Sequence, residues 1–419
     1  MGPDAVAIFQ GASMIPRSRD TEYPFRQDSD FWYLTGFDHP NATALLRTDG
    51  GPEFTLYVEP RNRELETWTG YRPGIEGARA DYGADEAYPQ AEFVNQLPDI
   101  VRRSRRIYHA LGRTPEIDRA ITSTLDGMRL RSRNVDAPAD AIVDPRSIVH
   151  EMRLYKEPAE LEIMRRASAI SREGHEAGAR LARSGAYEYE IQAVIEYTFR
   201  RLGARGPAYT TIVGGGNNAT VLHYVTNSEK LQNHEVMLVD AGCELEGYAS
   251  DVTRTYPVGG RFSAAGRAVY DVVLAAQRAG IGECAPGKNL ANVHAASVRT
   301  IVEGLVDLKL LAGDVDDLIA REAYRRFYMH KTSHWLGLDV HDVGNYGSDG
   351  NHRPLEPGMV FTVEPGIYVA ADDEDANPEF RGIGVRIEDD IAITEGGFEN
   401  LTQAIATDPE DVEALVTDR

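Results

Sequence analysis

Four carboxylates stand beside apolar runs of the sequence, where an acidic side chain is unfavourable to bury. Asp240 directly follows the run VMLV, Asp251 lies in a second strand-like run, and Glu364 and Glu388 occur in FTVEPG and VRIEDD. Any one of them could be a strand-end residue that bonds nearby N–H groups, but four in the same context argue for a shared cause. A buried carboxylate without a partner costs many kcal/mol or takes up a proton. The set predicts cations, arginines or raised pKa values, and two divalent ions would balance the four charges.

A histidine-rich segment strengthens the case for metal. MHKTSHWLGLDVHDVG contains His330, His334 and His341 within twelve residues. The first two are four residues apart, as in the zincin motif, but Lys331 stands where that motif requires glutamate, which excludes a zincin site. Several carboxylates with one imidazole form a hard, oxygen-rich donor set, which favours Mn²⁺ or a similar ion. Two such ions about 3.5 to 4 Å apart polarise a carbonyl and stabilise both sides of a hydrolytic transition state.

The glycine-rich stretch GGGNN, residues 214–218, looks at first like a phosphate-binding loop. The Gly-Lys-Ser/Thr ending of such a loop is absent, so we expect a turn.

The elements that position these residues form two domains. Up to about residue 150, short strand candidates such as FTLYVEP and RIYHA alternate with helical patterns such as AEFVNQLPDIVRRS, which predicts a compact α/β unit. A long helix is expected to begin at Pro158, followed by Glu160 in its first turn. We place the boundary just before it, which gives an N-terminal domain over residues 1–152 and a catalytic domain over 153–419.

The catalytic domain shows a doubled order of helices followed by strands. Helices extend to about Leu202, strands such as HEVMLVDAG and YASDVTRTYPV follow, helices return from Ala264 to Phe327, and GMVFTVEPGIYV and VRIEDDIAIT are strands again. Each half ends in two strands that we expect to carry inward-facing acids.

Composition limits the classes of partner. The 419 residues are 42% hydrophobic and 26% charged, with no run of the ~20 apolar residues that a bilayer span requires. The net charge of −22 argues against nucleic acid and anionic membrane surfaces as partners. Two cysteines and no recognisable secretory signal favour the cytoplasm.

At these residues the sequence resembles the Xaa-Pro aminopeptidases (aminopeptidase P), a branch of the "pita-bread" metallopeptidases that also includes prolidase. The similarity covers HYVTN, LVDAGCELEGYASDVTRTYPV, the histidine segment, LEPGMVFTVEPGIYV and RGIGVRIEDDIAIT, and TEYPFRQDSDFWYLTGF near the N-terminus. It implies an α+β protein, in which a smaller α/β domain precedes a pita-bread domain whose duplicated halves share an antiparallel sheet that carries the site.

The resemblance also implies roles for single residues. Asp240 would chelate one of two divalent ions, with Mn²⁺ favoured and Co²⁺ or Zn²⁺ as alternatives. His334 and Glu364 would bind the other ion, and Asp251 and Glu388 would bridge the two. The reaction would be hydrolysis of the bond between the first residue of a peptide and a proline in second position.

Further residues would act around the metals. His341 would hydrogen-bond the carbonyl oxygen as it gains charge. His223 and His330 would flank the proline pocket and position or shuttle protons, and Arg386 would offset negative charge. Their alternatives are a strand cap for His223 and a structural ion pair for Arg386.

Trp68 would reach a neighbouring subunit's active site in a homodimer or homotetramer, the alternative being a tryptophan buried in the core of the N-terminal domain.

Two departures from the family pattern stand out. The family usually opens with a basic helix before a segment like GPDAVAIFQGA, whereas this chain starts at that segment. We expect either that this helix is absent or that the given sequence begins after it. Lys331-Thr332 stands where some bacterial members have Gly-Leu, so details of the pocket are expected to differ.

Three other functions stay open at this point. Prolidase shares all five ligands and cleaves Xaa-Pro dipeptides. Metal-free creatinase-like chemistry and a non-catalytic peptide-binding protein are both disfavoured, because all five ligands are present.

Overall fold

The computed structural model describes residues 1–130 and 138–418. Contacts divide the chain into two units, Met1–Glu151 and Met152–Arg419, so that the division falls within helix α6 (Arg146–Leu154). The boundary expected from the sequence, between residues 152 and 153, lies next to this division.

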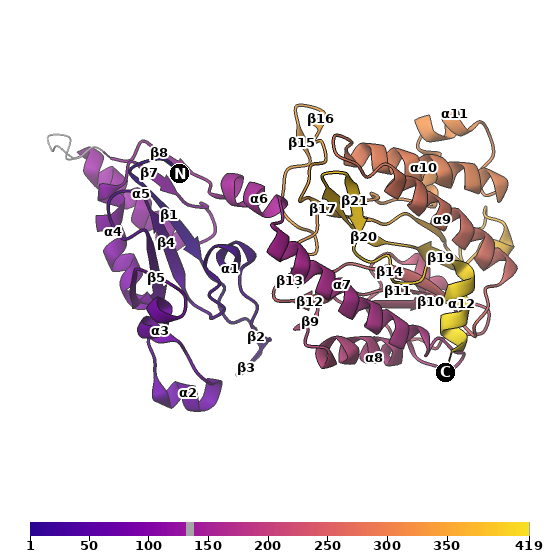
Figure 1. Ribbon diagram of the computed structural model, residues 1–419, viewed down its shortest axis with the longest axis horizontal. Helices are drawn as coiled ribbons and strands as arrows, with labels where there is room; N and C mark the ends of the chain where they lie inside the picture. Colours follow the sequence, from indigo (N-terminus) through magenta and orange to yellow (C-terminus); the bar gives the residue numbers. More distant parts are fainter. Residues whose placement is uncertain (131–137, 419) are drawn as a thin grey trace. The chain divides into compact units, whose positions relative to one another are not determined.

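The first unit is built on a six-stranded mixed sheet in the order β6-β5-β4-β1-β7-β8. The central strand β1 pairs with β4 antiparallel and with β7 parallel (Figure 1). The strands of this sheet are β1 Ala5–Gln10, β4 Thr43–Arg47, β5 Phe54–Val58, β6 Glu86–Pro89, β7 Arg106–Tyr108 and β8 Ala141–Val143, and a separate hairpin comprises β2 Pro16–Ser18 and β3 Thr21–Glu22.

Both faces of this sheet are buried, because alternate residues of a strand point to opposite faces. Ala7 and Phe9 belong to one apolar cluster, and Val6 and Ile8 belong to another. Helices α4 and α5 supply Leu97 and other side chains to the second cluster. The helices of this unit are α1 Ser29–Thr35, α2 Arg63–Thr69, α3 Gly74–Ala80, α4 Phe93–Arg103 and α5 Pro115–Leu130, besides α6.

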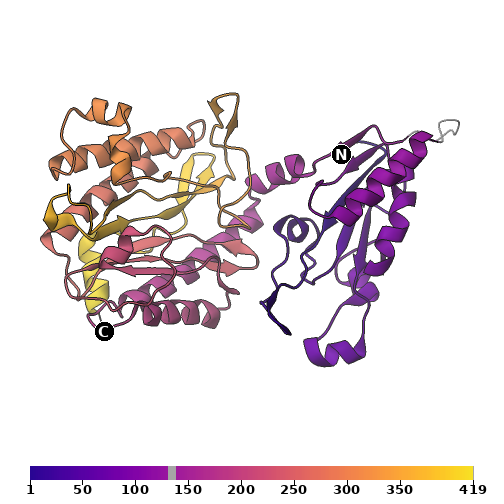
Figure 2. The ribbon, with the colours of Figure 1, turned by 180° about the vertical axis from the view of Figure 1, so that it is seen from behind.

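In the second unit, helices enclose several small antiparallel sheets. Helices α7 and α8 contact β9, β10, β12 and β13, whereas α9 contacts β17, β18 and β19 (Figures 1 and 2). The helices are α7 Pro158–Ala179, α8 Glu188–Arg201, α9 Ala264–Gly282, α10 Leu290–Asp307, α11 Val315–Ala320 and α12 Pro409–Thr417. Helix α7 begins at Pro158, as the sequence predicts, and the segment 214–218 leads into a short 3-10 helix, η2 (Gly216–Thr220), rather than into a long helix.

The sheets of the second unit are short. They have the orders β10-β11-β14, β13-β12-β9, β17-β20-β21, β18-β19 and β15-β16. Their strands are β9 Gly206–Pro207, β10 Ile212–Gly215, β11 Val236–Asp240, β12 Cys243–Leu245, β13 Tyr248–Ala249, β14 Thr253–Pro257, β15 Gly347–Ser348, β16 Asn351–His352, β17 Val360–Val363, β18 Gly366–Val369, β19 Ile383–Arg386, β20 Asp389–Thr394 and β21 Gly397–Asn400.

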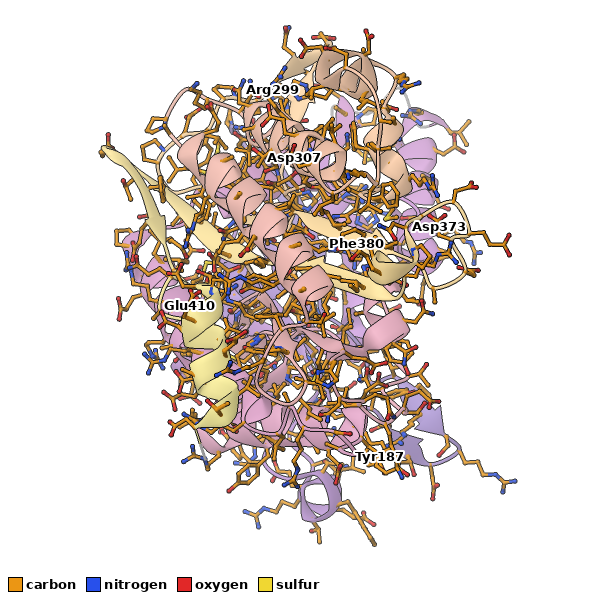
Figure 3. The ribbon with its side chains drawn as sticks, turned by 90° about the vertical axis from the view of Figure 1, so that its right-hand side faces the viewer. Tyr187, Arg299, Asp307, Asp373, Phe380 and Glu410 are labelled. Carbon is orange, nitrogen blue, oxygen red and sulfur yellow. The ribbon has the colours of Figure 1, made fainter. Side chains whose placement is uncertain are left out.

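One extensive core joins the helices to these sheets. It includes Phe199 of α8, Tyr270 of α9 and Tyr256 of β14, all fully buried. Figure 3 looks onto α9 and α12, where Glu410 in the first turn of α12 lies 2.9 Å from Arg267 of α9. Among the described residues, no helix is both long enough and apolar enough to cross a bilayer.

Asp240 lies in a strand as expected, but Asp251, Glu364 and Glu388 lie between strands, and for these three the sequence prediction is wrong. Asp240 is the last residue of β11, Asp251 lies between β13 and β14, Glu364 separates β17 from β18, and Glu388 separates β19 from β20. The reason is geometric: at a strand end the backbone leaves the ladder, so a side chain can turn toward a shared point. Apolar runs on both sides conceal these interruptions in the sequence.

Candidate active site and metal centre

A single large pocket in the second unit collects the predicted residues. Its volume is about 850 Å³. It is lined by the four acids and by His223, His330, His334, His341 and Arg386. We call Asp240, Asp251, His334, Glu364 and Glu388 the floor of this pocket and His223 and His341 its rim. All nine predicted residues of the catalytic unit therefore meet at one place.

The two halves of the unit bring the acids together through the same arrangement of strands. In each half an antiparallel strand pair ends at the pocket: β11 pairs with β14 up to Asp240↔Thr253, and β17 pairs with β20 up to Val363↔Asp389. Asp240 belongs to the first of these last pairs, Asp251 lies two residues before Thr253, and Glu364 and Glu388 adjoin the second pair. Two distant parts of the chain therefore bring their carboxylates to one place.

Three floor residues come close enough to share an ion. One ligand atom from each of Asp251, His334 and Glu388 lies within 4.8 Å of the others. The Nε2 atom of His334 is 3.3 Å from Asp251 Oδ2 and 3.6 Å from Glu364 Oε1. Its other ring nitrogen lies 3.0 Å from the carbonyl of Trp335, which fixes the ring with Nε2 toward the acids. This is the usual arrangement of a metal-binding histidine.

The electrostatics of the floor fit a site for cations. Burial and the neighbouring carboxylates raise the pKa of Glu388 well above its ordinary value, and burial raises the pKa of Glu364 to about 7. Burial also raises the pKa of Asp240, although Arg386 acts against this shift. For His334 burial is outweighed by the Asp251 carboxylate, so its pKa rises to about 9. Without metal ions, these raised pKa values mean that the floor residues hold protons. Divalent cations would replace the protons, and the oxygen-rich donor set suits such ions.

Arg386 is a buried link among several floor groups. Its Nη2 donates to Asp240 Oδ2 at 2.6 Å, its Nε donates to Thr253 Oγ1 at 2.9 Å, and its Nη1 donates to Tyr368 at 3.1 Å. Thr253 in turn donates to Glu388 Oε2 at 2.6 Å. The guanidinium therefore offsets negative charge and positions two acids, Asp240 directly and Glu388 through Thr253. Arg386 is thus both a charge-balancing residue and a member of a structural ion pair.

The three other predicted histidines have different surroundings. His330 uses both ring nitrogens, at 2.8 Å from the Lys331 carbonyl and 2.9 Å from the Tyr368 hydroxyl. Burial, with Arg386 nearby, lowers the pKa of His330 to about 3. A ring that stays neutral at physiological pH is better suited to positioning the substrate than to carrying protons. The ring of His341 meets the ring of His334 edge-on, with the ring centroids 4.4 Å apart, and partial burial lowers the pKa of His341. His223 lies on an exposed segment that lines the pocket.

A buried ion cluster underlies the loop between His334 and His341. Asp342 accepts from Arg153 at 2.6 Å and from Lys156 at 3.0 Å. Its backbone N–H donates to the Trp335 carbonyl at 2.8 Å. A Cβ atom at Gly337 would lie 2.1 Å from Asp342 Oδ2, so the close approach requires glycine. The cluster ties this loop to the segment that precedes α7.

Comparison with known proteins identifies the family of the chain. The chain matches Metallopeptidase family M24 over residues 162–395, more than half of its length, and Aminopeptidase P, N-terminal domain, over residues 1–108. The chain belongs to metallopeptidase family M24. The Xaa-Pro aminopeptidase of Escherichia coli is 45% identical to it over 99% of this chain and 94% of that protein.

Solved structures extend the similarity to the M24 fold. The aminopeptidase PepP of Pseudomonas aeruginosa has a TM-score of 0.96 at 45% identity, and Zn-substituted E. coli aminopeptidase P in complex with product has 0.94 at 44%. Each covers 99% of this chain and 94% of the other. The fold and the family expected from the sequence are confirmed.

The N-terminal unit of the M24 chain carries the remaining predicted residue. Trp68, in α2, is 83% exposed, and Leu65 and Tyr71 beside it are exposed as well. The alternative of a tryptophan buried in the core is therefore excluded. Trp68, Leu65 and Tyr71 instead form an exposed surface on this unit.

Sequence reasoning missed the residues that hold the ligands. Tyr209 donates to Asp240 Oδ1 at 2.6 Å, and Asp390 accepts from the backbone N–H of Asp251 at 3.1 Å. Asp390 stands two residues after the expected ligand Glu388 in IEDD, and this proximity could have drawn attention to it. Tyr209, in PAYTTIV, has no comparable signal in the sequence.

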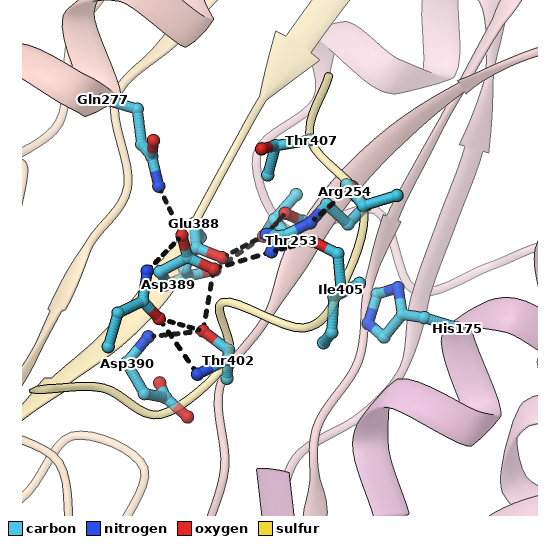
Figure 4. A network of polar contacts seen from close by, with 12 residues as sticks. His175, Thr253, Arg254, Gln277, Glu388, Asp389, Asp390, Thr402, Ile405 and Thr407 are labelled. Carbon is cyan, nitrogen blue, oxygen red and sulfur yellow. Dashed lines mark hydrogen bonds and ion pairs between the residues drawn. The ribbon is translucent and has the colours of Figure 1, made fainter. Parts of the chain in front are cut away.

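A second missed network lies behind Glu388 (Figure 4). Arg254, fully buried, donates to the Glu388 carbonyl at 2.5 Å and to Asp389 Oδ1 at 2.6 Å. Asp389 also accepts from Gln277 at 2.6 Å and Thr402 at 2.7 Å. The backbone that carries Glu388 is thus fixed on the side away from the pocket.

Proposed function

We propose that this chain is a dinuclear metal-dependent aminopeptidase that hydrolyses the bond between an N-terminal residue and a proline in second position. One observation carries the proposal: the whole predicted donor set meets in one pocket of an M24 chain that is 45% identical to an Xaa-Pro aminopeptidase over 99% of its length. Binding peptides without cleaving them would not require an intact set.

The floor residues would hold the metals as the resemblance implies. Asp240 would bind one ion, His334 and Glu364 the other, and Asp251 and Glu388 would bridge them. When bound, the ions would activate the nucleophile and polarise the scissile carbonyl. The protein's part is to fix the ligands, which Arg386, Thr253 and Tyr209 do through the hydrogen bonds described above.

The rim would act on the substrate. His341, whose pKa is lowered, is a neutral N–H donor at neutral pH and would donate to the carbonyl oxygen as charge develops there. Asp240 would lie near the free N-terminus of the peptide. His223 and His330 would flank the proline, with His330 held by Tyr368 as a fixed wall rather than as a proton carrier.

Two substrates separate this function from the nearest alternative, Xaa-Pro dipeptidase. The Mn²⁺-loaded protein is given Arg-Pro-Pro and Ala-Pro, with Arg-Ala-Pro as the control. We expect kcat/KM to be highest for Arg-Pro-Pro. Faster cleavage of Ala-Pro would establish a dipeptidase, and equal rates on Arg-Pro-Pro and Arg-Ala-Pro would establish a general aminopeptidase.

Mn²⁺ is the ion we propose, because the donor set is mostly carboxylate oxygen. Chelation should abolish activity, and Mn²⁺ should restore more of it than Zn²⁺ or Co²⁺ at equal loading. Full turnover by protein that elemental analysis finds metal-free would refute the proposal.

A homo-oligomer and a cytoplasmic location complete the proposal. The exposed aromatic surface around Trp68 supports the first, and two buried free cysteines, Cys243 and Cys284, are compatible with a reducing compartment. Light scattering should give at least twice the chain mass of 46.3 kDa, and Trp68→Ala should lower it. A monomer with full activity would remove Trp68 from the site.

A further inference from the structure

Glu188 is a fully buried carboxylate that the proposed reaction does not use. It stands in the first turn of α8, next to Tyr187, which is labelled in Figure 3. A buried charge needs compensation, and a carboxylate near a helix N-terminus gains part of it from the helix dipole. The remainder comes from hydrogen bonds whose donors belong to one segment of the chain.

The four donors surround His223 in the sequence. Oε1 of Glu188 accepts from the backbone N–H of Gly215 at 2.8 Å and from the side-chain amide of Asn218 at 3.0 Å. Oε2 accepts from the hydroxyl of Tyr224 at 2.9 Å and from the backbone N–H of Glu229 at 2.9 Å. Two donors thus precede His223 and two follow it, and one side chain fastens both ends of the segment.

The segment has little other regular structure to hold it. Residues 221–229 form neither helix nor strand, and His223 itself is exposed. A second buried side chain, Asn227, helps by accepting from Val213 N–H at 3.0 Å and donating to the Thr211 carbonyl at 2.8 Å. Glu188 also joins the two sides of His223, and two of its four partners, Gly215 and Asn218, belong to the stretch GGGNN.

We propose that Glu188 is a positioning residue that holds His223 at the wall of the pocket. This inference rests on the role of His223 in the proposed function. A carboxylate suits the task because it only accepts hydrogen bonds, and all four partners are donors. Glutamine has the same shape but turns one acceptor into a donor, so at least one contact becomes donor against donor.

The test compares Glu188→Gln, His223→Ala and the double variant, all loaded with Mn²⁺. We expect each single variant to lower kcat/KM for Arg-Pro-Pro, Glu188→Gln by ~10- to 100-fold as for other residues that orient active groups. The double variant should be no slower than His223→Ala alone, because Glu188 acts through His223. Multiplying effects, or unchanged kcat/KM in Glu188→Gln, would overturn the proposal.

Thr198→Ala is the matched control. Thr198 lies on the same helix, is buried, and donates to the Val194 carbonyl at 2.8 Å, a hydrogen bond within the helix itself. It should lower the melting temperature and leave kcat/KM of the folded enzyme unchanged. Loss of kcat/KM in this variant as large as in Glu188→Gln would mean that any disturbance of α8 is sufficient.

A measurement without turnover separates this proposal from the proposed function. The imidazole resonances of His223 in metal-free protein should shift in Glu188→Gln and stay in place in Thr198→Ala. If the wild-type protein cleaves no Xaa-Pro peptide, the proposed function fails, and the resonances still decide whether Glu188 positions His223. If His223→Ala keeps full activity on Arg-Pro-Pro, the positioning proposal fails while the aminopeptidase stands.

Discussion

The floor of the pocket and its rim differ in how they are held. Among the floor acids, Asp240 accepts from Arg386 and Tyr209, and Glu388 accepts from Thr253 and is carried on backbone that Arg254 fixes. The rim histidines, His223 and His341, are themselves exposed and stand on irregular segments. Their segments, rather than their rings, are anchored, by Glu188 and by the cluster at Asp342. The floor is built to keep charge in place, and the rim leaves its rings accessible.

This difference predicts separable failures. A change in the floor should empty the metal site, whereas a change at the rim should slow turnover with the metals retained. A change in the anchors of the rim should leave the metals bound, and at the buried Asp342 cluster it should act mainly on stability.

The largest effect is expected from Asp251→Asn. An amide is neutral and cannot bridge two cations as a carboxylate does, so the remaining acids would no longer balance the charge. We expect loss of at least one ion per chain and turnover near the metal-free background, measured by elemental analysis and kcat on the folded variant. The exposed Asp372→Asn should keep both. Two retained metals with near-normal turnover in Asp251→Asn would refute its assignment as a bridging ligand.

His341→Ala should lower kcat by ~10²- to 10³-fold, the usual effect of losing a donor to developing negative charge. Metal content should stay at the wild-type value, because the partner of His341 is the substrate oxygen. His352, which also lines the pocket, serves as a control: His352→Ala should change kcat little. An emptied metal site in His341→Ala would place this residue in the floor instead.

Asp342→Asn should act mainly on stability. It removes a charge that two buried cations share, and breaking a buried ion pair from one side costs about 3 to 5 kcal/mol. Denaturant unfolding should show this loss, and folded protein should keep its metals. Asp339→Asn provides the comparison, since Asp339 also contacts Arg153, at 2.9 Å, but its side chain is 38% exposed. Equal losses in both variants would mean that burial of the Asp342 charge is not what matters.

The sequence was most informative where residues that bind metal stand among neighbours that make them unusual. Acids beside apolar runs and three histidines within one segment predicted the site, and every one of these residues lines the same pocket. Helix α7 could be predicted from Pro158 and from Glu160 in its first turn. These signals are local, which is why one sequence is sufficient to read them.

What failed to appear in the sequence depends on contacts between distant segments. Asp240 and Arg386 meet across 146 positions, and Arg254 reaches the Glu388 carbonyl across 134. Glu188 stands in an ordinary helix start, with nothing nearby to distinguish it from a solvent-exposed glutamate. The breaks that put the acids at strand ends are likewise set by how the two halves meet, not by local propensity.

The smallest effect concerns His175, which contacts the backbone of Ala241, the residue after Asp240. It is fully buried; one ring nitrogen lies 2.9 Å from the Ala241 carbonyl and the other 3.2 Å from the Tyr256 hydroxyl, so the neutral ring satisfies both. Burial lowers its pKa from 6.5 to about 4. Between these values the unfolded chain binds a proton at His175 that the folded chain does not, so the contribution of His175 to stability falls as pH falls from 6.5 to 4 and is fully lost below 4. The shift corresponds to ~3 kcal/mol.

The test is denaturant unfolding of metal-free protein from pH 7 to pH 4. Over this range the wild type should lose about this much more stability than His175→Gln, which is less stable at pH 7 but has no ring to protonate. Parallel pH profiles for the two proteins would show that His175 takes up its proton in the folded state as readily as in the unfolded one, and that the strand behind Asp240 is open to water.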